Sequence, residues 1–175
     1  MIPRRAVHAR RAALSLVLVA AVCALVGCSA AVALDSAPAA ADKGCAEISV
    51  RLPHGLNDGA GGEIQRRETT AQGTAAWGSP ATVLLRCGVE PPVASPHCIG
   101  VNGVDWIRDD SGAPQFRFIT FGRVPATEVI VDSEQVSGST VLLDLVPAIS
   151  AVAPSGEHSC QNVGDIALPP VGRDR

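Results

Sequence analysis

The stretch from Trp77 to Trp106 places the tightest constraint on what this chain can fold into. It holds both tryptophans and two of the six cysteines. The run from Ala81 to Cys87 is almost continuously apolar, which is typical of an interior strand. Asn102 and Gly103 lie between two segments rich in β-branched residues, and such a pair accepts the positive φ angles of a type I′ turn. The stretch therefore predicts a buried strand followed by a β-hairpin.

The segments on either side predict a mixed fold. Residues 45–52 fit helical and strand periodicity almost equally, and we favour a short helix. Short strands are expected over 63–70, 115–121 and 128–132, and residues 137–150 carry apolar residues at helical spacing. The fold class that follows is α+β, a small antiparallel or mixed sheet of four to five strands with one or two helices on one face, stapled by disulfides.

The N-terminus has the pattern of an export signal. Four arginines precede the uncharged apolar run from Ala12 to Val26, and the first 27 residues contain no acidic residue. A run of this length is shorter than the roughly 20 residues that a membrane-spanning helix requires. It is typical of the apolar part of a signal peptide.

The residues that end this leader resemble a bacterial lipobox. Leu25 and Val26 are followed by Gly27 and Cys28. The resemblance implies cleavage between Gly27 and Cys28 and a diacylglyceryl group on the Cys28 thiol. Two acyl chains anchor a protein stably, whereas one chain holds it only marginally. We therefore expect an exported lipoprotein, anchored on the outer face of the cytoplasmic membrane.

Cleavage would leave a mature chain of 148 residues, Cys28 to Arg175, which suits one domain. The leader removes four of the 14 basic residues and none of the 17 acidic ones, so the mature net charge is −7. This acidity argues against nucleic acid as a partner. The expected organisation is a signal peptide over 1–27, a flexible Ala-, Ser- and Pro-rich tether over 28–44, a globular domain over 45–165 and a frayed tail over 166–175.

The remaining cysteines predict two disulfides, because an exported chain enters an oxidising compartment. They are Cys45, Cys87, Cys98 and Cys160. Three pairings are possible. Cys87 and Cys98 flank a proline-rich turn, so we favour Cys87–Cys98 with Cys45–Cys160.

Several sequence motifs cover most of the mature domain, and the central ones are the more specific. They are Trp77-Gly78-x-Pro80, Val83 to Val89, Val101 to Trp106, Arg123-Val124-Pro125 and Glu128-Val129. Together they resemble the motifs of one family of exported proteins and lipoproteins from high-GC Gram-positive bacteria, domain-of-unknown-function family 3515. The family supplies no activity, so the resemblance implies an envelope lipoprotein and adds no mechanism.

Candidate site residues come from the same motifs. Arg86 lies inside an apolar strand, and a buried guanidinium requires a partner. Asp105 is the counter-ion we expect, which would make the pair structural. The alternative is an arginine that binds an anion at the mouth of a pocket. Asn102 belongs to the same motif as Asp105 and Trp106 and is a further candidate. Trp77 and Trp106 could line a ligand groove, although tryptophans in a small strand-rich domain are usually core.

Metal binding and catalysis have weaker support. His97-Cys98 and His158-x-Cys160 could form a zinc site if all four side chains converged, but their spacing is not the usual one. No Gly-x-Ser-x-Gly motif is present, and paired carboxylates cannot be recognised from spacing alone. We therefore expect no cofactor, no metal and no catalytic residue.

The function expected from the sequence is a non-enzymatic binding module. Its partner would be another envelope protein or a cell-wall component. The alternatives are a small envelope hydrolase whose carboxylates converge only in the fold, and a lipoprotein that binds a metal or a small ligand.

Overall fold

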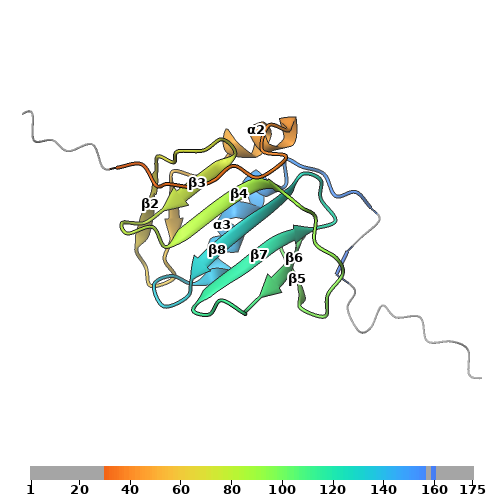
Figure 1. Ribbon diagram of the computed structural model, residues 1–175. Helices are drawn as coiled ribbons and strands as arrows, with labels where there is room; N and C mark the ends of the chain where they lie inside the picture. The colour runs from red at the N-terminus through yellow and green to blue at the C-terminus, as the bar shows by residue number, and fades with distance from the viewer. Residues whose placement is uncertain (1–29, 157–158, 161–175) are drawn as a thin grey trace, which may run out of the picture. The chain divides into compact units, whose positions relative to one another are not determined.

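The computed structural model describes residues 30–156 and 159–160. Eight strands and two helices are formed over these residues (Figure 1). In chain order they are α2 (Lys43–Ser49), β1 (Gly55–Asn57), β2 (Glu63–Arg67), β3 (Thr74–Trp77), β4 (Val83–Val89), β5 (Cys98–Val101), β6 (Val104–Asp109), β7 (Gln115–Phe121), β8 (Ala126–Asp132) and α3 (Gly138–Ile149).

All eight strands belong to one curled sheet with the order β1-β2-β3-β4-β8-β7-β6-β5. Every neighbouring pair is antiparallel. The expected sheet of four to five strands is therefore wrong. The sequence missed β1 and β3, because strands of three and four residues are too short to show a period.

Strand β4 shows how the sheet divides its two faces. Val83, Leu85 and Cys87 are buried, whereas Leu84 and Arg86 between them are partly exposed. Successive side chains of a strand point to opposite faces. One face thus packs on the helices, and we call the other the outer face. In Figure 1, α3 lies behind the sheet.

The core lies between the sheet and the two helices. It combines Ile48 of α2 and Leu142 and Leu145 of α3 with side chains from the sheet. Trp77 and Trp106 are both 0% exposed and belong to this core. Trp77 donates a hydrogen bond from its indole nitrogen to the carbonyl of Pro53 at 3.2 Å. The hypothesis that the two tryptophans line a ligand groove is therefore not supported.

The predicted hairpin is present. β5 and β6 pair from Cys98 opposite Ile107 to Val101 opposite Val104. Asn102 and Gly103 have φ angles of 46° and 82°, which the tight turn requires. Asn102 is thus a turn residue.

Residues 31–42 pack against the sheet and are not a free tether. The amide of Ala39 donates to the carbonyl of Gly88 at 3.0 Å, and the amide of Val32 donates to that of Glu68 at 2.8 Å. Ala37 and Ala40 are 6% exposed. Figure 1 shows this segment, in red to orange, crossing in front of β3 and β4. The expectation of a flexible tether over 28–44 does not hold for this part.

The disulfides are Cys45–Cys87 and Cys98–Cys160. The favoured pairing, Cys87–Cys98 with Cys45–Cys160, is therefore wrong. β4 and β5 are separated by β8, β7 and β6, at about 4.8 Å for each step across the sheet. Cys87 and Cys98 thus lie far beyond the Cα separation of about 4.4–6.8 Å that a disulfide requires. Proximity in sequence was a misleading guide because the chain between them crosses the sheet.

Candidate functional site

The outer face carries a row of alternating charges over four neighbouring strands. Arg86 is on β4, Glu128 on β8, Arg117 on β7 and Asp109 on β6. Arg86 lies directly opposite Glu128, and Asp109 lies directly opposite Arg117. Opposite charges that face each other across strands stabilise a sheet.

Glu128 is the centre of this row. Its carboxylate accepts a hydrogen bond from Nε of Arg86 at 2.6 Å and another from Nε of Arg117. The side chain of Glu128 is 2% exposed, whereas those of Arg86 and Arg117 are 34% and 42% exposed. Burial pushes the pKa of Glu128 upward, but the two arginines outweigh it and hold the pKa below its ordinary value. The carboxylate is therefore ionised and fixes both guanidinium groups.

This geometry corrects the expected Arg86–Asp105 pair. Asp105 is on β6, three strand positions away from Arg86. Its carboxylate accepts a hydrogen bond from the amide of Cys160 at 2.9 Å. The cation that interacts electrostatically with Asp105 is the buried Arg123, which also donates to the carbonyl of Gly103 at 3.0 Å. Arg86 therefore forms an ion pair as expected, but its partner is Glu128 and not Asp105.

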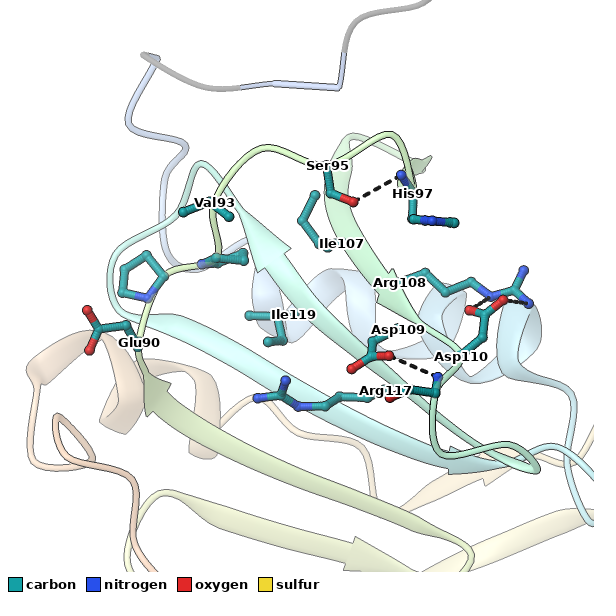
Figure 2. A pocket seen from close by; sticks show the side chains of 13 residues that line it. Glu90, Val93, Ser95, His97, Ile107, Arg108, Asp109, Asp110, Arg117 and Ile119 are labelled. Atoms are coloured by element: carbon teal, nitrogen blue, oxygen red, sulfur yellow. Dashed lines mark hydrogen bonds and ion pairs between the residues drawn. The ribbon is translucent and has the colours of Figure 1, made fainter.

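A cavity of about 680 Å³ opens on the outer face beside Arg117. We call it the outer-face pocket. Its floor comes from β6 and β7 and its wall from the segment between β4 and β5, as Figure 2 shows. Its volume lies within the range of about 300–1,000 Å³ that is typical of small-molecule sites. The lining residues are Glu90, Pro91, Pro92, Val93, Ser95, His97, Ile107, Arg108, Asp109, Asp110, Ser111, Arg117 and Ile119.

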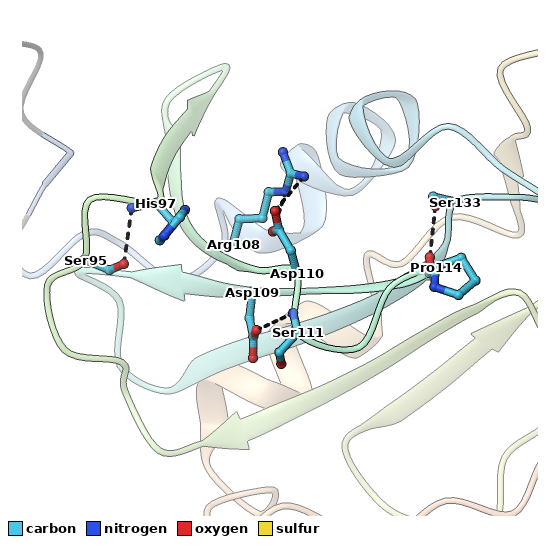
Figure 3. Close-up of polar contacts among 8 residues, drawn as sticks. All are labelled: Ser95, His97, Arg108, Asp109, Asp110, Ser111, Pro114 and Ser133. Carbon is cyan, nitrogen blue, oxygen red and sulfur yellow. Dashed lines mark hydrogen bonds and ion pairs between the residues drawn. The ribbon is translucent and has the colours of Figure 1, made fainter.

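Figure 3 shows the polar contacts that several residues of the pocket make. Arg108 and Asp110 form an ion pair with N–O distances of 2.8 and 3.0 Å. Asp109 accepts a hydrogen bond from the amide of Ser111 at 2.9 Å. This bond is the main reason why the pKa of Asp109 is lowered, and the charge of Arg117 lowers it further. Among the described residues, no cation forms a direct ion pair with Asp109.

The arrangement is better suited to binding than to general-acid chemistry. The Ser95 hydroxyl accepts a hydrogen bond from the backbone amide of His97 at 3.2 Å, so this bond does not engage the imidazole. Asp109 is held ionised, and a general acid needs the opposite shift. The pocket instead offers an apolar floor, a carboxylate and a positioned guanidinium.

Two of the four candidate zinc ligands are not available to a metal. Cys98 and Cys160 are joined to each other and supply no thiolate. His158 lies outside the described residues. Within residues 30–156 and 159–160, no group of three or more His, Cys, Asp or Glu side chains could hold a metal ion.

Sequence reasoning found Arg86 but missed Glu128, Arg117 and Asp109. The sequence signal that could have found the strand residues is the alternation of side chains between the two faces of the sheet. Arg86, Arg117 and Glu128 each occupy the position between two core-facing side chains, which assigns all three to the outer face. The strand order that brings these residues together cannot be read from any local pattern in the sequence. Gly27 and Cys28 lie outside the described residues.

Comparison with known proteins identifies the family. The family described as protein of unknown function (DUF3515) matches residues 11–158, well over half of the chain, and the chain belongs to it. The resemblance noted from the motifs is thus confirmed. No curated protein and no solved structure matches the chain. Among the described helices, none is long and apolar enough to cross a membrane.

Proposed function

We propose that this chain is a lipoprotein of the cell envelope that binds another envelope protein or a cell-wall component through the outer-face pocket. The lipid on Cys28 would hold it at the outer face of the cytoplasmic membrane. The basic residues, apolar run and lipobox-like ending of the leader support the anchor. The two disulfides fit an oxidising compartment.

One observation carries the binding role. The outer-face pocket places Arg117 beside an apolar floor, and the buried Glu128 holds that arginine in position. A guanidinium that is already ordered loses less rotamer freedom when a ligand binds.

The anchor is tested by fractionation of cells that produce the full-length protein. Wild-type protein should enter the membrane fraction and carry the mass of a diacylglyceryl group. Cys28→Ala should lose that mass and become extractable without detergent. Cys23→Ala is the control, because this cysteine lies within the leader and leaves with it. An unchanged membrane fraction for Cys28→Ala would refute the anchor.

The binding role is tested by sedimentation of the detergent-purified full-length protein with purified cell wall or envelope membranes. Val93 lines the pocket and is 84% exposed, so Val93→Asp can alter the pocket without disturbing the core. Val50 is 80% exposed and does not line the pocket, so Val50→Asp is the matched control. The proposal predicts loss of sedimentation for Val93→Asp alone. Equal sedimentation of both variants would contradict it.

A further inference from the structure

The terminal nitrogens of Arg117 are available to a ligand. Glu128 accepts from Nε, and no other described group takes a hydrogen bond or ion pair from this guanidinium. A guanidinium carries further N–H donors on its two terminal nitrogens, arranged as a fork that matches a carboxylate. Arg117 lines the outer-face pocket, so a carboxylate that enters the pocket can be bound there.

Asp109 supplies the opposite charge at the same end of the pocket. It lies directly opposite Arg117 across β6 and β7. Figure 2 shows the two side chains next to each other on the floor. The Ser111 amide orients the Asp109 carboxylate, which keeps further acceptor capacity for an ammonium group.

An apolar surface adjoins this charged pair. Ile107 and Ile119 are the next pair on the same face of the same two strands, directly opposite each other. A ligand therefore meets a cation and an anion side by side, followed by two isoleucines. Only a ligand with both charges at one end and an apolar portion beyond them satisfies all three features.

We infer that the outer-face pocket binds an α-amino-carboxylate end group carrying an apolar stem. The α-carboxylate contacts the terminal nitrogens of Arg117, the α-ammonium group contacts Asp109, and the stem covers Ile107 and Ile119. The inference rests on the proposed function for the choice of pocket, and it names the chemical class of the ligand. The volume of about 680 Å³ also leaves room for a larger molecule that ends in this group.

The test is calorimetric titration of the detergent-purified full-length protein with L-leucine and D-leucine. N-acetylleucine and leucinamide are the matched probes, because each lacks one of the two charges. We expect saturable binding of at least one leucine enantiomer with a Kd of about 1 mM or tighter. Both blocked probes should bind at least about tenfold more weakly.

Variants then assign the contacts. Arg117→Gln and Asp109→Asn should each weaken leucine binding by about tenfold or more. Asp110→Asn is the control, because Asp110 lines the same pocket but is paired with Arg108. Its affinity should stay close to that of the wild type. Asp109 is on the surface, so this variant reports on binding even if Arg117→Gln alters folding through Glu128.

Three results would overturn the inference. They are no saturable binding of either enantiomer, equal affinity for the blocked and free probes, and equal loss in Asp109→Asn and Asp110→Asn. If leucine fails while Val93→Asp still abolishes sedimentation, the pocket is a binding site and only the ligand class is wrong. If both fail, the proposed binding role is wrong as well.

Discussion

Glu128 and Arg86 lie directly opposite each other on β8 and β4, and Nε of Arg86 donates to the Glu128 carboxylate at 2.6 Å. Arg117 binds the other oxygen of the same carboxylate. The acid is buried and the two bases are partly exposed. This asymmetry makes the cost of a substitution depend on which charge it removes.

The first prediction concerns that asymmetry. Replacement of both Arg86 and Arg117 by Met leaves a buried, unpaired carboxylate and should lower the free energy of unfolding by about 3–5 kcal/mol. Glu128→Gln leaves two guanidinium groups that water can reach, so its loss should be smaller. Urea unfolding followed by circular dichroism compares the two. A larger loss in Glu128→Gln would show that the carboxylate is not the group that needs partners.

The second prediction concerns pH. The folded-state pKa of Glu128 lies below its ordinary value of 4.5, so its stabilising effect is complete above that value. The effect is lost as pH falls further, through the folded-state pKa. Between neutral pH and strongly acidic pH, the wild type should therefore lose more stability than Glu128→Gln. Thermal unfolding of both proteins over this range measures the difference, and parallel curves would contradict the assignment.

The third prediction concerns the disulfides. Non-reducing peptide mapping, with a cleavage between Cys87 and Cys98, should recover the pairs Cys45–Cys87 and Cys98–Cys160. A disulfide typically contributes about 2–4 kcal/mol. Removal of Cys45–Cys87 should cost more than removal of the other bridge, because Cys45 and Cys87 are buried at 0% and 1% exposure. A Cys87–Cys98 peptide would contradict the fold itself.

The fourth prediction concerns the segment over residues 31–42. Gly88 has a φ of +91°, and a Cβ there would lie 2.3 Å from the carbonyl carbon of Ala39. Gly103 has a similar φ of +82° with no atom within 4 Å of its Cβ position. Gly103→Ala should therefore cost only about 1–2 kcal/mol of backbone strain. Gly88→Ala should cost more and should expose the amide of Ala39 to hydrogen exchange.

Equal stability losses in the two glycine variants, with the Ala39 amide still protected in both, would contradict the packing of this segment on β4.

Local features of the fold could be predicted from the sequence, but their arrangement could not. The hairpin around Asn102 and Gly103 follows from turn chemistry, and α3 follows from helical spacing. The order β4-β8-β7-β6-β5 depends on contacts between segments that are distant in sequence. Both the wrong disulfide pairing and the wrong partner for Arg86 come from assuming that neighbours in sequence are neighbours in the sheet.

The candidate site was accordingly only half predictable. An arginine within an apolar strand indicates a buried charge and a need for a partner. The identity of that partner, Glu128, depends on β4 and β8 being neighbours. The contact of Arg117 with the same carboxylate depends on β7 and β8 being neighbours. Asp109 was not among the candidate site residues from the sequence, and only the register of β6 and β7 places it opposite Arg117.

The central claim is that the outer-face pocket contacts an envelope component in the cell. The most direct measurement is photocrosslinking in living cells, with a photoreactive residue at position 93 in one strain and at position 50 in another. Both native valines are exposed, at 84% and 80%, and only Val93 lines the pocket. The account predicts a discrete adduct from position 93 that Arg117→Gln reduces, and none from position 50. Equal adducts at both positions, or an adduct at 93 that Arg117→Gln leaves unchanged, would contradict it.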